Sequence, residues 1–334
     1  MTNFNNTLDF LDWAFVALLK RTPSPQESQH LEAAIETQSM TQLQVLALII
    51  DGQEYRNSNI DNEFVPSGHF YSAVPSLADR RRVLDSPTQS APPPGIDLNH
   101  TTQVQLLKSF EQYYDDNLFA VEKCSERRYY SNNPAFSWHD AFVLHAMIKS
   151  FKPRSIIEIG CGFSSGVTLD CIEDIDNYTP EVVFIEPFPE TLNSVLYPQD
   201  SILCGLIDTP AQEVAFEKFT ALKANDVLFI DSTHVSKLGS DVNHLFFEIL
   251  PRLDSGVLVH IHDIFYPFEY PRDWIDQGRA WNELYLVRAL LAATERYKII
   301  AFNHYLAATE KSYLNQAMPR LAEGNCGSLW LRIN

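Results

Sequence analysis

The apolar residues at the start of the chain recur with the spacing of amphipathic helices. A first set lies three or four positions apart: Leu8, Leu11, Phe15, Leu18 and Leu19. Ser24 followed by Pro25 provides an N-cap and a first-turn proline for a second helix. A third set ends near Asp51-Gly52 and comprises Leu43, Leu46, Leu48 and Ile49. The pattern predicts a small all-helical module over residues 1–57.

The next segment, residues 58–100, has a different composition. Prolines are frequent, at Pro66, Pro75, Pro87 and Pro92 to Pro94, and they disfavour long regular elements. The segment also carries large side chains that a disordered tether would lack: Phe64, His69, Phe70, Tyr71, Val74 and Leu77. We expect an ordered strap that lies on the domain that follows.

From residue 101 to 334, short β-rich runs alternate with helical patterns. The runs cover 155–159, 182–185, 201–206, 227–230, 257–261, 298–302 and 328–333. Helical patterns cover 102–114, 137–150, 165–175, 189–196, 211–222, 240–250 and 279–294. Such alternation is typical of βαβ units. The sequence therefore predicts an α/β domain with a Rossmann-like, mainly parallel seven-stranded sheet and helices on both faces.

Charge and cysteine usage narrow the class of protein. There are 25 Lys and Arg against 43 Asp and Glu, a net charge of −18, so nucleic acid and anionic membrane surfaces are poor partners. No run approaches the roughly 20 apolar residues of a membrane helix, and the first residues lack a signal-peptide pattern. The five cysteines are scattered, which disfavours a disulfide framework. We expect a cytoplasmic protein.

A glycine-rich turn follows the first predicted strand of the α/β domain. Glu158, Gly160 and Gly162 lie in the sequence EIGCGFSSG, where glycines let the backbone approach a ligand and a helix begins. The second strand ends at Glu186, 26 positions after Gly160, where an acidic side chain in this fold accepts ribose hydroxyls, and Phe188 is placed to cover an adenine ring. A plain tight turn and an exposed strand end remain the structural alternatives.

These motifs resemble those of class I S-adenosylmethionine-dependent methyltransferases. Within that superfamily, the sequence of residues 226–271 resembles a bacterial methyltransferase family. The resemblance extends upstream to two further segments, FVPSGHFYSAVPSL at 64–77 and PGIDLN at 94–99. The helices of 1–57 resemble a small bacterial module of unknown function, whose Leu-x-Arg-x-Pro-x-Pro-like signature matches at 19–25. Its glycine after the first leucine is Lys20 here.

The resemblance implies roles for particular cofactor-binding residues. Gly160 and Gly162 would line the methionine part of S-adenosylmethionine, and Glu158 would help to fix its amino group. Glu186 would hold the ribose and Phe188 would flank the adenine. Asp231, after the fourth strand, belongs to the same motif set.

Ionisable side chains follow the fourth and fifth strands. Asp231 and His234 follow the fourth, and His262 and Asp263 follow the fifth. Because neighbouring parallel strands end at one edge of the sheet, all four should converge where methyl transfer occurs. A histidine could take the proton of the acceptor. In related metal-dependent O-methyltransferases, residues at the places of Asp231, His262 and Asp263 bind a divalent ion, but His262 replaces an oxygen donor, which disfavours magnesium.

Aromatic clusters supply candidates for contact with the acceptor. They place His69 and Tyr71 in the strap, Trp138 before the first strand, and Glu269 after the fifth strand. Aromatic groups with interspersed polar groups suit a small organic molecule. Packing of a lid is the alternative for each.

We therefore predict an enzyme that transfers a methyl group from S-adenosylmethionine to a small molecule, with a hydroxyl oxygen as the favoured acceptor. The first alternative is an NAD-dependent oxidoreductase, which the spacing G-x-G-x-x-x-G disfavours. The second is a non-catalytic cofactor-binding scaffold. Whichever of these functions holds, residues 1–57 could bind a protein partner.

Overall fold

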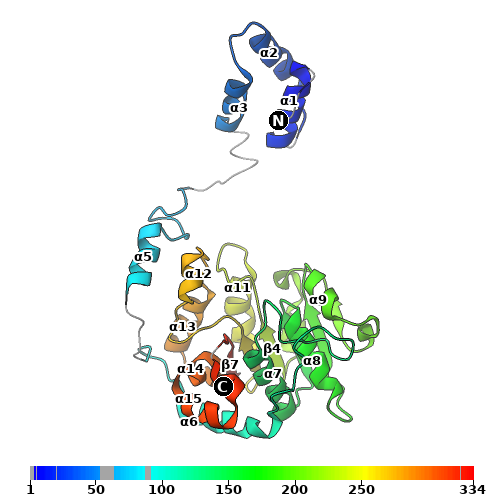
Figure 1. Ribbon diagram of the computed structural model, residues 1–334, viewed down its shortest axis with the longest axis vertical. Coiled ribbons are helices and arrows are strands. Elements are labelled where there is room, and N and C mark those ends of the chain that lie inside the picture. Colours follow the sequence, from blue (N-terminus) through cyan, green and yellow to red (C-terminus); the bar gives the residue numbers. More distant parts are fainter. Residues whose placement is uncertain (1–3, 5, 20, 53–63, 87–91, 324) are drawn as a thin grey trace. The chain divides into compact units, whose positions relative to one another are not determined.

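The protein is described by a computed structural model, which covers residues 4, 6–19, 21–52, 64–86, 92–323 and 325–334 (Figure 1). The chain divides into two compact units, Met1–Arg82 and Val83–Asn334.

The first unit contains three amphipathic helices within residues 6–52, as the apolar pattern predicts: α1 (Thr7–Leu19), α2 (Pro25–Glu36) and α3 (Gln42–Asp51). The Ser24 hydroxyl caps α2 by accepting from the backbone N–H of Glu27, whose carboxylate accepts from the N–H of Ser24. Thr41 and Gln44 form the same capping box on α3. The helices bury Phe10, Leu11, Phe15, Leu31 and Val45.

The predicted strap of 58–100 is divided between the two units. Residues 58–63 and 87–91 lie outside the described residues, and the unit boundary falls inside helix α5 (Leu77–Asp85). Phe64 and Phe70 are 87% and 80% exposed. Leu98, by contrast, belongs to the core of the second unit, and the side-chain amide of Asn99 donates to the carbonyl of Ile299 at 2.8 Å. Leu98 and Asn99 thus connect the end of the predicted strap to the core of the α/β unit.

In the described part of the second unit, seven strands form one sheet in the order β3-β2-β1-β4-β5-β7-β6. Their bounds are β1 Ser155–Ile159, β2 Glu181–Ile185, β3 Gly205–Ile207, β4 Val227–Ile230, β5 Leu258–Ile261, β6 Tyr297–Phe302 and β7 Leu329–Ile333. Only β7 pairs antiparallel to its neighbours, which confirms the mainly parallel sheet. The strand predicted at 201–206 begins later, because Pro198–Ile202 forms a 3₁₀ turn in which Asp200 accepts from the N–H of Tyr197.

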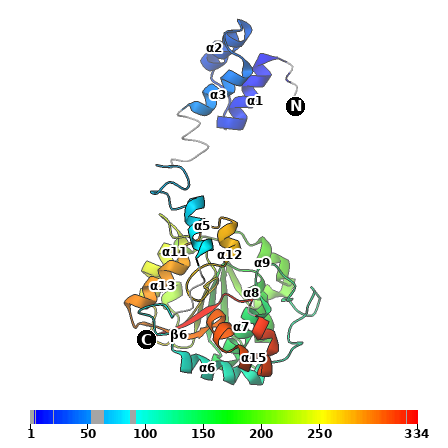
Figure 2. The ribbon, with the colours of Figure 1, turned by 60° about the vertical axis from the view of Figure 1, so that its left-hand side comes forward.

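Helices cover both faces of the sheet, as Figure 2 shows. One buried cluster unites α6 (His100–Ser109), α7 (Trp138–Phe151), α8 (Phe163–Glu173), α9 (Glu190–Val195), α14 (Asn303–Thr309) and α15 (Lys311–Ala317). The other unites α10 (Phe216–Thr220), α11 (Asp241–His244), α12 (Arg272–Asp276) and α13 (Glu283–Ala293). Successive strand residues contribute to opposite clusters, as strand geometry requires. In the described residues, no helix has the length and apolarity needed to cross a membrane.

We predict that the second unit folds without the first and that the residues at the end of the strap stabilise it. A variant lacking residues 1–82 should keep the melting temperature of the α/β unit. A variant lacking residues 1–100 should melt lower, because it loses the burial of Leu98, worth about 1.5–3 kcal/mol, and the Asn99 hydrogen bond. Thermal unfolding of both variants tests this. Equal melting temperatures would show that the end of the strap contributes nothing.

Candidate functional site

A cavity of about 350 Å³ lies beyond the carboxyl ends of β1, β2 and β4. Its lining includes four of the residues predicted to bind a cofactor: Gly160, Glu186, Phe188 and Asp231. Gln212, which follows β3, also lines it. The other two predicted cofactor residues, Glu158 and Gly162, lie outside the lining. In open α/β sheets this edge is where ligands bind.

The first glycine of the turn is required by a close backbone approach. Gly160 has φ +75°, and a Cβ atom there would lie 1.7 Å from the carbonyl oxygen of Asp231. Only glycine lets the turn after β1 reach the end of β4 in this way. At Gly162 a Cβ would lie 2.9 Å from a methyl carbon of Thr191. Gly166 approaches another segment, since its Cβ would lie 3.2 Å from the Cβ of Arg128.

Two backbone N–H groups hold the carboxylate of Glu186 at the cavity. One oxygen accepts from the N–H of Cys161 at 3.1 Å, and the other accepts from the N–H of Phe188 at 2.8 Å. The carboxylate thus ties the end of β2 to the glycine turn. Phe188 is 75% exposed beside it, so its ring is available to a planar ligand.

Glu158 is fully buried beneath the turn. Its Oε1 accepts from the hydroxyls of Ser164 and Ser165, at 2.6 and 2.9 Å. Its Oε2 has no hydrogen-bond partner among the described residues. Burial raises the pKa of Glu158 to about 8, although the two serine hydrogen bonds oppose the shift. Without a cation nearby, this carboxyl holds its proton at neutral pH.

The four residues predicted to act on the acceptor do converge. The Nε2 of His234 lies 3.3 Å from Asp231 and 3.5 Å from Asp263. The Nδ1 of His262 lies 3.7 Å from Asp231 and 3.4 Å from Asp263. Two carboxylates thus lie between two histidines. Because Asp231 also lines the cavity, the cluster adjoins it.

Charge and backbone strain mark this cluster as unusual. Burial lowers the pKa of His234, but hydrogen bonds to Asp231 and Glu283 outweigh it and raise the value to about 10. The pKa of His262 is likewise raised, because Asp263 and Asp231 outweigh its burial. Both histidines therefore carry protons at neutral pH when no other cation is present. His234 and Asp263 also adopt left-handed backbone conformations, with φ +59° and +58°, a strain typical of functional sites.

Each histidine of the cluster also contacts a second, buried carboxylate. The sequence motifs did not assign these two carboxylates to the site. Glu283, at the start of α13, lies 2.9 Å from the Nδ1 of His234. Asp140, on α7, lies 3.6 Å from the Nε2 of His262. Asp140 lies two positions after Trp138, whereas Glu283 is 49 residues from its partner His234 and follows no motif.

The four candidate acceptor contacts belong to both units. His69 and Tyr71 belong to the first unit, where the N–H of Tyr71 donates to the His69 ring. Trp138 is buried and stacks on Phe142 with ring centroids 5.6 Å apart, the position of a core side chain. Glu269 is half-buried and accepts from the Tyr285 hydroxyl at 2.6 Å.

Comparisons with known proteins agree with this geometry. Residues 157–264 match the model of a family described as a methyltransferase domain. An uncharacterized protein of Archaeoglobus fulgidus is 33% identical over 184 residues, which cover 51% of this chain and 80% of that protein.

Two solved structures illustrate the likeness in fold. The O-methyltransferase TomG from Streptomyces achromogenes, in complex with S-adenosylmethionine, is 14% identical over 68% of this chain and 96% of its own, with a TM-score of 0.42. The Podospora anserina methyltransferase PaMTH1, bound to S-adenosylhomocysteine, is 15% identical over 77% of this chain and 95% of its own, with a TM-score of 0.38.

The family assignment therefore rests on the matched domain and on the archaeal relative. The matched residues contain the glycine turn, Glu186 and all four residues of the histidine and aspartate cluster. An NAD-dependent oxidoreductase and a non-catalytic scaffold are set aside by the same match. The chain belongs to the family of the archaeal protein, and it is a class I S-adenosylmethionine-dependent methyltransferase.

Proposed function

We propose that the protein transfers the methyl group of S-adenosylmethionine to a hydroxyl oxygen of a small molecule. One observation carries the proposal: Asp231 lines the cavity and also lies within 4 Å of both His234 and His262. The cofactor cavity and a cluster able to accept a proton thus share a residue. The acceptor hydroxyl is proposed to lie between them.

The residues around the cavity fit S-adenosylmethionine. The carboxylate of Glu186 suits the two ribose hydroxyls, and the exposed ring of Phe188 suits the adenine. Glu158 lies outside the cavity lining and beneath the turn, and its unpartnered Oε2 would be the atom that holds the cationic amino group. When bound, the cofactor supplies an electrophilic methyl group on a sulfonium. Methyl transfer then needs an in-line approach and an acceptor that can lose its proton.

His234, His262, Asp231 and Asp263 are the proposed catalytic residues. A histidine takes the proton of the hydroxyl as the oxygen attacks, and the neighbouring aspartates stabilise the resulting imidazolium. Since both histidines are protonated at neutral pH, one must first lose its proton. The rate should therefore rise with pH above neutrality.

A divalent cation is the second candidate for activating the hydroxyl. Asp231, His262 and Asp263 each offer a donor atom, and these atoms lie within 4.8 Å of one another. A cation there would lower the pKa of a bound hydroxyl. One imidazole with two carboxylates favours a transition metal over magnesium.

The remaining assignments are part of the same proposal. Glu269 would contact the acceptor, the role of His69 and Tyr71 as acceptor contacts stays a prediction, and Trp138 is better explained by packing. Residues 1–57 would bind a protein partner, since Trp13 and Leu43 on its helices are 42% and 78% exposed. The scattered cysteines support a cytoplasmic location.

The function is tested by incubating the protein with methyl-labelled S-adenosylmethionine and a panel of hydroxylated sugars and phenols. Formation of S-adenosylhomocysteine that depends on one acceptor class is the expected result. An untargeted comparison of metabolites between wild-type and deletion strains would then identify the natural acceptor. Methylation of amines or thiols, with hydroxyls inert, would contradict the proposal.

Glu186→Ala should weaken S-adenosylmethionine binding tenfold or more. The substitution removes charge-assisted hydrogen bonds to the ribose, each worth about 1.5–3 kcal/mol. Isothermal titration calorimetry measures the affinity, and Glu190→Ala, at an exposed position four residues on, is the matched control. An unchanged affinity, with folding confirmed by thermal melting, would place the ribose elsewhere.

Glu158→Gln should remove a pH dependence of stability. The folded-state pKa of Glu158 is about 8, against 4.5 when unfolded. The folded state therefore binds the extra proton between these values, and stability falls as pH rises through this window, by a few kcal/mol. Urea unfolding at pH 5 and pH 8 should show a larger loss in the wild type than in the Gln variant. Parallel losses would mean that Glu158 ionises normally.

A further inference from the structure

Glu283 has no place in the motifs of the sequence, yet it is the most deeply buried carboxylate in contact with the catalytic cluster. Its side chain is 1% exposed, whereas those of Asp231 and Asp263 are 29% and 15% exposed. It lies outside the lining of the cavity. A buried carboxylate is costly unless it is paired and hydrogen-bonded, so its partners reveal its role.

Both oxygens of Glu283 are used within the loop that follows β4. Oε2 accepts from the Nδ1 of His234 at 2.9 Å, and Oε1 accepts from the hydroxyl of Ser232 at 3.0 Å. The backbone N–H of His234 in turn donates to that hydroxyl at 3.3 Å. The carboxylate thus spans the loop from Ser232 to His234.

The backbone at the start of α13 also binds the loop that follows β4. The N–H groups of Asn282 and Glu283 both donate to the carbonyl of His234, at 3.0 and 3.1 Å. The ring of Trp281 lies 4.4 Å from the His234 ring, centroid to centroid. These contacts hold His234 in its left-handed conformation of φ +59°, which would otherwise be strained.

The consequence concerns which ring nitrogen faces the reaction. The Nδ1 of His234 is hydrogen-bonded to Glu283, which keeps a proton on that nitrogen. The Nε2 of the same ring faces Asp231 and Asp263. We propose that Glu283 is a positioning residue that orients His234 and fixes its Nδ1 proton, so that Nε2 serves the acceptor. This inference rests on the proposed function of His234 in proton transfer.

The first test is spectroscopic and needs no acceptor. Protein labelled with ¹⁵N-histidine should show a strongly downfield Nδ1 proton, as expected for a ring nitrogen bonded to a carboxylate, and His234→Ala identifies the signal by its loss. In Glu283→Gln the signal should move upfield while the thermal melt stays cooperative. Glu310→Gln, which alters a peripheral contact to His100 at 3.5 Å, should leave it unchanged. An unmoved signal in Glu283→Gln would overturn the proposal.

The second test is kinetic and uses methyl-labelled S-adenosylmethionine with the hydroxylated acceptors named above. Glu283→Ala should lower kcat by about 10²-fold while the Kd for S-adenosylmethionine stays near that of the wild type, and Glu283→Gln should retain part of the rate. In a His234→Ala background, Glu283→Ala should cost little more, because its effect passes through that ring. A full additional loss would assign Glu283 a purely structural role. Full activity of His234→Ala would instead refute the proposed function.

Discussion

Replacing either histidine of the cluster, His234→Ala or His262→Ala, is expected to slow methyl transfer by about 10²–10⁴-fold. The binding of S-adenosylmethionine should stay near that of the wild type, because neither histidine lines the cavity. The physical reason is that a neutral hydroxyl attacks poorly until its proton is taken. Steady-state kinetics of S-adenosylhomocysteine formation and calorimetry of cofactor binding measure the two quantities separately.

The control for this experiment is His100→Ala, whose half-exposed ring lies beside Glu310. It should leave the rate unchanged. In the wild type, kcat should rise with pH above neutrality, because the pKa values of both catalytic histidines are raised and only the deprotonated ring accepts a proton. A rate that levels off below pH 7 would contradict this assignment.

Chelation separates the two ways of activating the hydroxyl. If a histidine is the base, a chelator leaves turnover unchanged. If a cation activates the hydroxyl, chelation abolishes turnover, and His262→Ala and Asp263→Ala both lose bound metal. His234→Ala should then retain metal, because the three grouped donors are Asp231, His262 and Asp263. Chelator-insensitive turnover with both histidine variants fully active would refute both versions.

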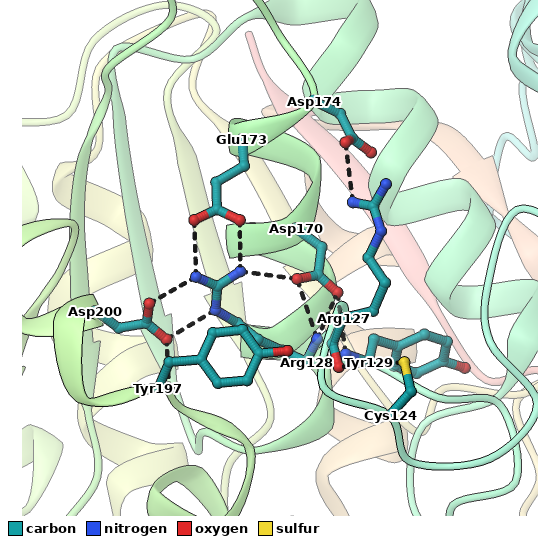
Figure 3. Close-up of polar contacts among 9 residues, drawn as sticks. All are labelled: Cys124, Arg127, Arg128, Tyr129, Asp170, Glu173, Asp174, Tyr197 and Asp200. Atoms are coloured by element: carbon teal, nitrogen blue, oxygen red, sulfur yellow. Dashed lines mark hydrogen bonds and ion pairs between the residues drawn. The ribbon is translucent and has the colours of Figure 1, made fainter.

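Arg128→Met is expected to lower the free energy of unfolding by about 3–5 kcal/mol, the typical cost of breaking a buried ion pair. The guanidinium of Arg128 is fully buried and contacts three carboxylates (Figure 3). Its bonds to Asp200 are bidentate, at 2.7 and 2.6 Å, and it meets Asp170 at 2.8 Å. Methionine would leave the nearly buried Asp170 and Asp200 without their cation.

The neighbouring arginine provides a matched control. Arg127 bonds Asp174 at 2.9 Å, but the two side chains are 39% and 32% exposed. Arg127→Met should therefore cost less than about 1 kcal/mol. Urea unfolding measures both variants, and adding Asp200→Asn to Arg128→Met should restore part of the loss. Equal losses in the two single variants would show that the buried Arg128 ion pairs stabilise the protein no more than the exposed pair of Arg127 does.

The sequence predicted the strands and the convergence of the cluster for a simple reason. Buried parallel strands such as Val227–Ile230 are continuous apolar runs, and βαβ topology places neighbouring strand ends side by side. Knowing that Asp231 and His262 each follow such a strand is therefore enough to bring them together. The boundary of β3 was predicted poorly because the hydrogen bonds of Asp200 outweigh the apolar pattern of 201–206.

The sequence by itself determined the helical module, the order of strands and helices, the glycine turn and the residues at the strand ends, since all of these are local patterns. The tertiary structure alone decided that Glu283 contacts His234 and that Asp140 contacts His262. It also decided that Trp138 is a core residue and that Gly160 is required by the carbonyl of Asp231. These are contacts between residues tens of positions apart, as between His234 and Glu283. Periodicity encodes which face of an element is buried, but only the packing of whole elements fixes which polar groups meet there.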